Sequence, residues 1–376
     1  MKIESLKLIN FRNYTMTELS FPAMINVFFG ANAQGKTNLL EGIYYGALGL
    51  SHRTSNEDEL LRFQTEGFSV LVNFLKEDEP HTLQVKRFIE NEKLKKLLLL
   101  DAKKISSREQ YGFLKVILFS PEDLAIIKGD PAQRRRFLDM GLAQTDPVYY
   151  ELLVQYNRNL KQRNKLLKNI REQGAPESLL TTWDENISIL AAKILKKRLE
   201  NLEGFSNLTT EIGVTLTGSK EKLGINYELK ANNGVFLRVT SSDTRDWAAF
   251  YAQSLYERRF KDIRLGYTGI GIHRDDLLFT INEYDSRAFG SQGQKRSYAL
   301  TLKLAQLEFI KRECGEYPIL LLDDVMSELD EERRTLLLKF LDARVQTFIT
   351  VNDRSLIPSL PDTAYFKVQE GVIEKG

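Results

Sequence analysis

Apolar and polar residues alternate along much of the first third of the chain. A two-residue period is typical of strands that bury one face, and a short apolar run bounded by glycine or proline is typical of a buried strand. Strands are predicted over residues 3–9, 17–22, 24–29, 67–76, 81–89 and 114–119. Residues 36–50 have the spacing of a helix, so this part of the chain is expected to be α/β.

The middle of the chain, residues 121–264, has a mainly helical pattern, because apolar residues recur there at intervals of three and four. Helices are predicted over residues 147–172, 178–203 and 243–261, with a few strand-like residues near 223–239. This stretch is expected to form a lobe of its own.

Strand patterns return after residue 264. Strands are predicted over 276–282, 317–322, 346–351 and 364–369, and helices over 292–313 and 330–341. The outer thirds, residues 1–120 and 265–376, are therefore predicted to form one α/β lobe, lobe I. The helical lobe II, residues 121–264, is inserted into it.

Composition limits the choice of partner and compartment. The 376 residues suit two lobes, and a net charge of only +2 means that a nucleic acid would have to bind a local basic surface. The single cysteine, Cys314, excludes an internal disulfide and fits a reducing compartment. Apolar runs fall far short of the ~20 residues of a membrane span, and no signal peptide is apparent, so we expect a cytoplasmic protein.

A glycine-rich loop with the pattern GxxxxGKT follows the apolar run 24–29. The residues of this loop are Gly30, Ala31, Asn32, Ala33, Gln34, Gly35, Lys36 and Thr37, and Asn38 comes next. Backbone N–H groups of such a loop surround phosphate oxygens, while the lysine reaches the β- and γ-phosphates and the threonine hydroxyl binds Mg²⁺. A structural glycine turn is the alternative, but a strand before the loop and a helix after it favour binding of ATP and Mg²⁺.

An apolar run that ends in two acids, Ile319 to Asp324, has the form of a Walker B strand. The first acid of such a strand holds Mg²⁺, so Asp323 is the metal candidate together with Thr37. Asp324 stands where a carboxylate can orient or deprotonate the attacking water, although Asp is also a common helix cap. Lys36 and Asp324 are the predicted catalytic residues.

A loop of small residues around Ser291 opens the helix predicted over 292–313. A serine at a helix N-terminus can bind an anion, and a simple helix cap is the alternative. The loop lies between the glycine loop and the Walker B strand, and residues 327–330 follow. This succession resembles the signature and D-loop of ABC ATPases.

The ABC resemblance implies an ATP site shared by two molecules, in which the signature of one subunit closes on the nucleotide of the other. Because one chain carries one copy of each motif, an ATP-dependent head-to-tail homodimer is expected. The residues expected to reach the partner's nucleotide are Ser291, Gly293, Gln294 and Asp330.

A basic stretch without acids runs from Leu152 to Arg171 and also contains Arg163. At ~100° per residue, four of its charges share one helical face. These candidate DNA contacts are Arg158, Lys161, Lys165 and Lys168. Such a stripe can neutralise several phosphates, and a solvated helix surface is the alternative.

Three groups of segments resemble the RecF family, bacterial recombination-mediator ATPases related to the heads of SMC proteins. The segments are Leu8 to Tyr14 with the glycine loop and Ser51 to Thr54; Pro121 to Pro131 with Arg134 to Asp139; and His273 to Asp276 with the Ser291 loop and Asp323 to Asp330. The resemblance spans almost the entire chain and implies an α/β ABC-type P-loop ATPase head interrupted by a helical lobe.

The resemblance to RecF implies an ATP-dependent DNA-binding protein of recombinational repair, associated with the nucleoid. Its ATP-driven dimer would clamp duplex DNA near single-strand gaps and, with RecO and RecR, promote RecA loading. Weak, DNA-dependent ATP hydrolysis would reset it. By the same resemblance, Arg12 and Asn13 should contact the nucleotide.

Some positions depart from related ATPases. Most ABC-type ATPases have Glu where this chain has Asp324, which implies slow hydrolysis, and none of residues 347–353 is the histidine that many use as a switch. Thr350 and Asn352 are the candidates for that role. Ile272 stands where the RecF family usually has proline.

Two other classes of ATPase compete with this interpretation. A chromosome-organising SMC head would need hundreds of heptad residues between its motifs, whereas the insertion here is short and is interrupted by Gly174, Pro176 and Gly204. A transporter ATPase usually has a glutamine-containing loop before its helical lobe, where this chain has Ser120 to Asp123.

Overall fold

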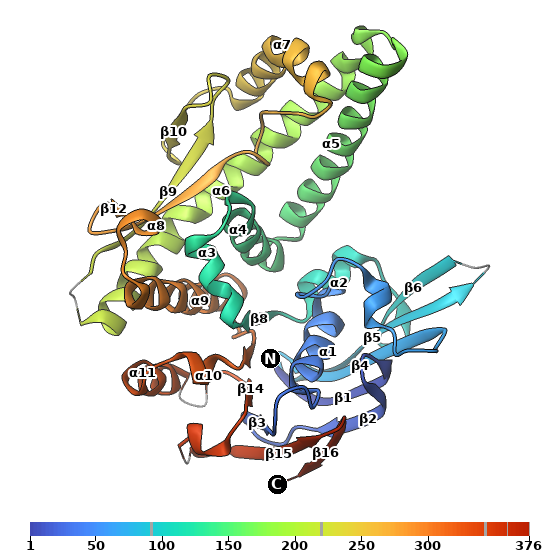
Figure 1. The fold of residues 1–376 in the computed structure, drawn as a ribbon, viewed down its shortest axis with the longest axis vertical. Helices are drawn as coiled ribbons and strands as arrows, with labels where there is room; N and C mark the ends of the chain where they lie inside the picture. The colour runs from blue at the N-terminus through green and yellow to red at the C-terminus, as the bar shows by residue number, and fades with distance from the viewer. Residues whose placement is uncertain (91–92, 219–220, 342–343, 359, 376) are drawn as a thin grey trace. The chain divides into compact units, whose positions relative to one another are not determined.

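The computed structural model describes residues 1–90, 93–218, 221–341, 344–358 and 360–375 (Figure 1). The chain divides into two compact units: unit 1 comprises Met1–Asp123 and Gln306–Gly376, and unit 2 comprises Leu124–Ala305. Within the described ranges, no helix has the length and apolar character that a membrane span requires.

A six-stranded sheet of unit 1 contains the apolar runs of the sequence. Its strand order is β16-β15-β3-β14-β13-β8, with antiparallel pairing between β15 and β16 and parallel pairing along the rest. Parallel strands are usually covered on both faces, which explains why they appear as continuous apolar runs. The bounds are β3 (Ile25–Phe29), β8 (Val116–Phe119), β13 (Ile319–Asp323), β14 (Thr347–Val351), β15 (Thr363–Gln369) and β16 (Val372–Lys375).

A second sheet of unit 1 is antiparallel and has the order β2-β1-β4-β5-β6-β7. Its strands are β1 (Lys2–Phe11), β2 (Tyr14–Ser20), β4 (Gly67–Lys76), β5 (Glu79–Glu90), β6 (Lys93–Leu100) and β7 (Lys103–Lys104). Strand β6 is not among the predicted strands, because its apolar run Leu97–Leu100 does not alternate. Pairing with β5 determines its conformation.

Helix α1 (Lys36–Leu48) contacts strands of both sheets and is buried along most of its length. Two glycines allow this close packing. A Cβ on Gly42 would lie 2.8 Å from the Leu8 side chain of β1, and a Cβ on Gly46 would lie 2.7 Å from Val72 of β4. The other helices of unit 1 are η1 (Glu57–Leu60), α2 (Ser107–Phe113), η2 (Pro121–Asp123), α10 (Val325–Glu328), α11 (Glu331–Leu341) and η4 (Arg354–Leu356).

Unit 2 is mainly helical, and its longest helix, α6, contacts α5, α7 and β9. The helices are α3 (Leu124–Lys128), α4 (Pro131–Thr145), α5 (Pro147–Gln173), η3 (Glu177–Leu179), α6 (Leu180–Thr217), α7 (Trp247–Leu265), α8 (Ser286–Phe289) and the first part of α9 (Gln292–Cys314). An antiparallel sheet of order β10-β9-β11-β12 completes the unit. Its strands are β9 (Leu223–Lys230), β10 (Phe236–Val239), β11 (Asp276–Ile281) and β12 (Tyr284–Asp285).

The end of unit 2 differs from the end predicted for lobe II at residue 264. The compact unit continues to Ala305, because β11 pairs along its whole length with β9 and therefore belongs to the sheet of unit 2. A strand shows from its own pattern that it needs a partner, but not which strand the partner is. The lobe boundaries at 120/121 and 264/265 are thus replaced here by boundaries at 123/124 and 305/306.

The predicted helices are confirmed, and one of them is longer than expected. Helix α6 continues past Gly204 to Thr217. Glycine costs only about 1 kcal/mol relative to alanine in a helix, and a Cβ at Gly204 would meet nothing within 4 Å. Burial of Phe205 and Ile212 beyond the glycine stabilises the continuation.

Candidate nucleotide site

The glycine-rich loop leaves the C-terminal end of β3 and enters α1. Gly30 and Gly35 have φ angles of 154° and 111°, which residues with a Cβ rarely adopt. A Cβ on Gly30 would also lie 2.3 Å from the Val368 carbonyl oxygen. Residues Ala31–Ala33 at the tip of the loop are exposed. The two glycines therefore form a narrow turn with its tip open to solvent, as a phosphate-binding loop requires.

The β15–β16 turn supports the loop from one side. The Gln34 carbonyl oxygen accepts a hydrogen bond of 3.1 Å from the Gly371 N–H, and its side-chain oxygen accepts one of 2.6 Å from the Glu370 N–H. From another side, the Tyr14 hydroxyl donates to the Gly35 carbonyl oxygen at 3.0 Å. These contacts hold the loop in place through residues that the motif does not include.

The Lys36 ammonium lies against the loop itself. It donates hydrogen bonds of 2.7 Å to the carbonyl oxygens of Gly30 and Ala31, and one of 3.1 Å to Asn352 Oδ1. Burial lowers the pKa of Lys36, while the charges of Asp324 and Asp323 act in the opposite direction. A buried cation is thus positioned beside the loop where an anion would lie.

Two residues predicted to hold a metal lie together. The Thr37 hydroxyl donates a hydrogen bond of 2.9 Å to Asp323 Oδ1. The same oxygen accepts one of 2.7 Å from the Thr350 hydroxyl. Burial raises the pKa of Asp323, and the hydrogen bonds from Thr350 and Thr37 lower it in part.

These oxygen donors fit Mg²⁺, which usually binds proteins through one or two carboxylates and completes its shell with water and phosphate oxygens. Over the part of the chain that the structure describes, no cluster of three or more His, Cys, Asp or Glu side chains could hold a metal alone. Thr37 and Asp323 supply two oxygen donors, and the other ligands of a Mg²⁺ ion would come from water and phosphate.

Asp324 has a strained backbone. Its φ of 52° places it in the left-handed region, which costs a residue with a Cβ of order 1–3 kcal/mol. Its N–H donates to Thr350 Oγ1 at 2.9 Å, and its Oδ1 accepts from the Ser327 hydroxyl at 2.6 Å. Although Asp324 precedes α10, its carboxylate accepts no capping hydrogen bond from a backbone N–H of that helix. The cap alternative does not explain the position of this carboxylate.

The two switch candidates contact different parts of the site. Thr350, the last residue but one of β14, pairs with Asp323 of β13 and donates to its carboxylate, whereas Asn352 accepts from Lys36. Strand β14 lies between β3 and β13 in the sheet, so the residues after it are located between the two motifs. Sequence order alone could not reveal this, because β14 comes last of the three in the chain.

Arg12 and Asn13 lie next to the loop but bind other side chains. The Arg12 guanidinium makes two hydrogen bonds of 2.8 Å to the buried carboxylate of Glu41. Burial alone raises the pKa of Glu41, but the hydrogen bonds from Arg12 and Ser51 outweigh it and hold this pKa below its usual range. Asn13 Oδ1 accepts from Asn38 Nδ2 at 2.8 Å. Nucleotide contacts by Arg12, Asn13 and Asn38 stay predictions.

Sequence reasoning gave no role to Glu41 and Arg53. Arg53, which is exposed, donates to Asn38 Oδ1 at 2.7 Å and to Glu41 at 3.4 Å. The sequence does contain a signal for this pair. Glu41 is an acid within the otherwise largely apolar helix α1, five positions after Lys36, and Arg53 follows soon after the end of that helix.

The Ser291 loop caps helix α9. Ser291 Oγ accepts from the Gln294 N–H at 3.2 Å, and Gln294 Oε1 accepts from the Ser291 N–H at 2.8 Å. Ser291 is exposed, and Lys128 of α3 hydrogen-bonds Gln292 at the start of the helix. The loop is thus a formed, solvent-facing helix N-terminus.

Asp330 has a similar position at the start of α11. Its Oδ1 accepts from the Arg333 N–H at 2.9 Å, and its carboxylate forms an ion pair with the Arg333 side chain. Roles of Ser291, Gly293, Gln294 and Asp330 toward a partner's nucleotide stay predictions.

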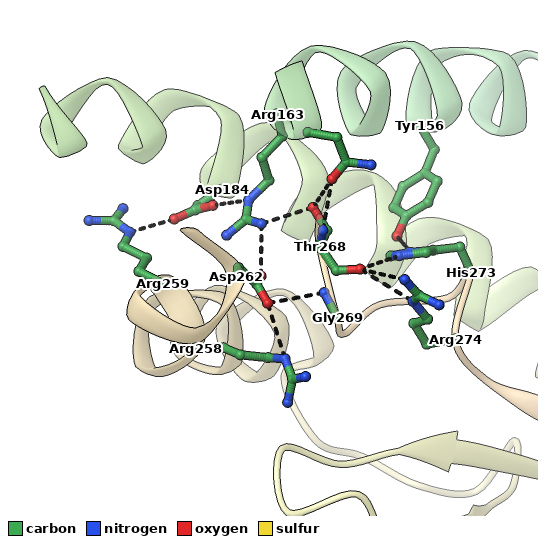
Figure 2. Close-up of polar contacts among 11 residues, drawn as sticks. Tyr156, Arg163, Asp184, Arg258, Arg259, Asp262, Thr268, Gly269, His273 and Arg274 are labelled. Carbon is green, nitrogen blue, oxygen red and sulfur yellow. Dashed lines mark hydrogen bonds and ion pairs between the residues drawn. The ribbon is translucent and has the colours of Figure 1, made fainter. Parts of the chain in front are cut away.

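The basic stretch divides between two faces of α5. Arg158, Lys161, Lys165 and Lys168 are exposed, whereas Tyr156 and Leu167 are buried, as the helical period predicts. Arg163 is 0% exposed and forms ion pairs with Asp184 at 2.7 Å and with Asp262 at 2.9 Å (Figure 2). Its charge is neutralised inside unit 2 and is not available to DNA.

Comparison with known proteins identifies the family. Residues 2–371 match the model of the family described as RecF/RecN/SMC N terminal domain. The chain is 43% identical over 352 residues to the DNA replication and repair protein RecF of Natranaerobius thermophilus, covering 93% of this chain and 91% of that protein. The corresponding protein of Halalkalibacterium halodurans is 39% identical over 377 residues, with 100% of both chains covered.

Solved structures agree. The structure described as the recombination mediator protein RecF-ATPrS in the RecFOR pathway has a TM-score of 0.89 and 36% identity, and the match covers 99% of this chain and 97% of that one. A related structure of RecF-ATP has the same TM-score and identity. An SMC head bound to the C-winged helix domain of ScpA has a TM-score of 0.54 at 14% identity, a likeness of fold alone.

Proposed function

Since the chain belongs to the RecF family, with the α/β head fold that it shares with ABC-type ATPases and SMC heads, we propose that it is an ATP-dependent DNA-binding protein of recombinational repair. The observation that supports this most directly is the joint position of Lys36, Thr37 and Asp323 at the glycine-rich loop. Similar proteins described with ATP and an ATP analogue have the same fold over nearly their whole length.

ATP would bind through the loop backbone of residues 30–37, with the Lys36 ammonium beside its phosphates. Thr37 and Asp323 would hold Mg²⁺, which supplies charge neutralisation at the phosphate oxygens when bound. Arg12, Asn13 and Asn38 complete the proposed contacts. The hydrogen bonds from Arg12 to Glu41 and from Asn38 to Asn13 keep these residues next to the loop before any contact with nucleotide.

Asp324 is the proposed general base. A carboxylate in this position accepts a proton from the attacking water, and its hydrogen bond from Ser327 restricts its rotamer. Aspartate is one methylene shorter than the glutamate of most ABC ATPases, so the water must approach closer to the main chain. Hydrolysis is expected to be slow and to act as a switch.

A second copy of the chain would complete the site. Ser291, Gly293 and Gln294 form an exposed helix N-terminus that can bind the γ-phosphate of a partner's ATP, with Asp330 beside the shared interface. ATP binding then drives head-to-tail dimerisation, and hydrolysis at Asp324 releases the pair.

DNA would be held by the exposed charges of α5, with Mg²⁺–ATP controlling the dimer that clamps duplex near a single-strand gap. RecR, with RecO, is the proposed protein partner, and RecA loading is the outcome. An SMC-like chromosome scaffold is less well supported, since the longest described helix has 38 residues and arms of heptads would need many more.

Sedimentation with and without ATP, in the presence of gapped duplex, tests this function. Wild type should sediment as a dimer only with ATP, whereas Ser291→Arg should stay monomeric because the exposed signature loop no longer accepts a phosphate. Ser242→Arg, at another exposed serine of unit 2, is the matched control and should dimerise. ATP-dependent dimerisation of Ser291→Arg would contradict the proposed composite site.

A further inference from the structure

The loop that follows α7, residues 266–274, contacts α5 between Tyr156 and Arg171, and Figure 2 shows the contacts of Tyr156 and Arg163. Near the C-terminal end of α5, Arg171 and Lys168 lie so close to Gly266 that a Cβ there would be 3.0 Å and 3.3 Å from their side chains. In the middle, Asn164 Oδ1 accepts from the Thr268 N–H at 2.8 Å. At the other end, the hydroxyl of Tyr156 lies 2.7 Å from His273 Nδ1.

Buried charges fix this loop in position. Arg163 donates to Thr268 Oγ1 at 2.8 Å, in addition to its ion pairs with Asp184 and Asp262. Asp262 in turn accepts from the Gly269 N–H at 3.2 Å. The loop is therefore hydrogen-bonded to two charged side chains that are themselves paired, through the Thr268 hydroxyl and the Gly269 N–H, as Figure 2 shows.

Tyr267 is the residue of this fixed loop that faces solvent. Its neighbours Gly266 and Thr268 are buried, while Tyr267 is 41% exposed. The Arg274 guanidinium lies over the Tyr267 ring at 5.0 Å from its centroid. Arg274 is held there by two hydrogen bonds of 3.2 Å to the Thr268 carbonyl oxygen. An aromatic ring and a guanidinium are thus presented together on a rigid backbone.

The surroundings of Tyr267 are basic. Lys168 and Arg171, both exposed, lie against the preceding residue, and Lys168 is also one of the four charges on the outer face of α5. Arg264 at the end of α7 is exposed as well. Arg171 is paired with its neighbour in the chain, Glu172. The Tyr267–Arg274 pair therefore continues the positive face of α5 and adds to it a surface on which a base can stack.

We propose that Tyr267 and Arg274 form a stacking platform for an unpaired base of single-stranded DNA, at the end of the basic face of α5. Aromatic rings and guanidinium planes stack on bases, but the bases of a continuous duplex already stack on one another. The platform therefore selects the single-stranded part of a gapped duplex. This inference rests on the proposed DNA binding and assigns to it the residues that distinguish a gap.

The test compares gapped duplex with continuous duplex of the same length, with ATP present, by fluorescence anisotropy. Tyr267→Ala should weaken binding to gapped DNA about tenfold, because one stacked base is lost, and should leave binding to continuous duplex unchanged. Tyr267→Phe keeps the ring and should bind both DNAs like wild type. An equal loss for both DNAs, no loss for either, or a loss in Tyr267→Phe equal to that in Tyr267→Ala would overturn the proposal.

A matched control is available in the same unit. Tyr256 on α7 is 64% exposed and also carries a guanidinium, that of Arg259, at 5.0 Å from its ring centroid. Tyr256→Ala should keep the wild-type preference for gapped DNA. If it loses that preference as Tyr267→Ala does, the effect belongs to exposed aromatic residues in general and the platform is rejected.

A further pair of measurements separates this inference from the proposed function. The double variant Lys161→Glu with Lys165→Glu should weaken binding to both DNAs. Wild-type affinity for both would contradict the proposed DNA binding by α5, and would leave the Tyr267 result to be judged separately. With 2-aminopurine in the gap, stacking should quench its fluorescence in wild type and in Tyr267→Phe but not in Tyr267→Ala. Quenching that persists in Tyr267→Ala would overturn the platform even if the DNA face is correct.

Discussion

The Thr37 hydroxyl and the Asp323 carboxylate, which lie in two motifs far apart in the sequence, are joined by a hydrogen bond of 2.9 Å. Asp323 is 7% exposed, and burial raises its pKa, so its charge is disfavoured unless a cation or hydrogen-bond donors compensate. Thr350 supplies one such donor at 2.7 Å. The arrangement keeps a buried carboxylate at the proposed metal site.

Replacing the Asp323 carboxylate by an amide should abolish metal binding without impairing folding. In Asp323→Asn, the side-chain oxygen can still accept from Thr37 and Thr350, but the charge that binds Mg²⁺ is lost. We expect ATP hydrolysis to fall at least about 100-fold and the effect of Mg²⁺ on ATP affinity to disappear. Titration calorimetry with and without Mg²⁺ measures this, and Mg²⁺-dependent affinity equal to that of wild type would refute the assignment. The thermal midpoint should not fall, because a buried charge is removed.

Removing the proposed base should leave association intact. Asp324→Asn can still accept from the Ser327 hydroxyl but cannot take a proton from water. Hydrolysis should fall by about 10²–10⁴-fold, while ATP-driven dimers form normally and persist longer. Turnover and sedimentation on the same samples check both parts, and undiminished turnover would exclude Asp324 as the base.

Two arginines of α5 should respond in opposite ways to truncation. Arg163→Met removes the fully buried partner of Asp184 and Asp262, which keep only the less buried Arg259 and Arg258, so the free energy of unfolding should fall by about 3 kcal/mol. Arg158→Met, on the exposed face, should change it by less than about 0.5 kcal/mol but weaken DNA binding. Urea unfolding and salt-dependent DNA titrations measure the two effects. Reversal of the pattern would show that the faces of α5 are misassigned.

His273 should make stability depend on pH. Burial, and after it the nearby charges of Arg274, Arg135 and Arg163, lower its pKa from 6.5 to about 3, against the opposing effect of the Thr268 carbonyl. Between these values the unfolded state binds the proton and the folded state does not, so the free energy of unfolding falls as pH drops below 6.5.

The variant His273→Asn lacks this proton. Its free energy of unfolding should have a slope against pH that is smaller than that of wild type by up to about 1.4 kcal/mol per pH unit below pH 6.5. Burial raises the pKa of Asp275 to about 6, which acts with the opposite sign between pH 6 and 3.8 in both proteins. Urea unfolding from pH 7 to pH 5 measures the difference, and identical slopes would show that His273 is not buried as a neutral ring.

The glycine-rich loop, the acids Asp323 and Asp324 at the end of the β13 run, and the long helices could be predicted from the sequence because each depends on neighbours in the chain. The helical period also separated the outer charges of α5 from Arg163. What the period could not supply was the identity of Asp184 and Asp262, since ion-pair partners distant in sequence leave no local pattern.

The same limit applies to the rest of the site. Asn352 reaches Lys36 only because β14 lies between β3 and β13, and the end of unit 2 depends on the pairing of β11 with β9. The contact of Arg12 with nucleotide stays a prediction, and the sequence did not reveal that its guanidinium binds Glu41 of α1. Contacts between segments far apart in the chain determine these three arrangements. The sequence around each residue would allow several different contact partners.

The glycines at positions 42 and 46 let α1 press against β1 and β4, roughly one and a half and two and a half turns beyond the threonine of the proposed metal site. The depth at which this helix seats in the core therefore sets how far Thr37 stands from Asp323. Neither glycine lies at the phosphate-binding loop. A single methyl group at either one would push α1 away from the sheet and so change the position of Thr37. Thr37 and Asp323 would lose their alignment before the protein loses its fold. The defect would appear as weak metal affinity in a well-folded protein.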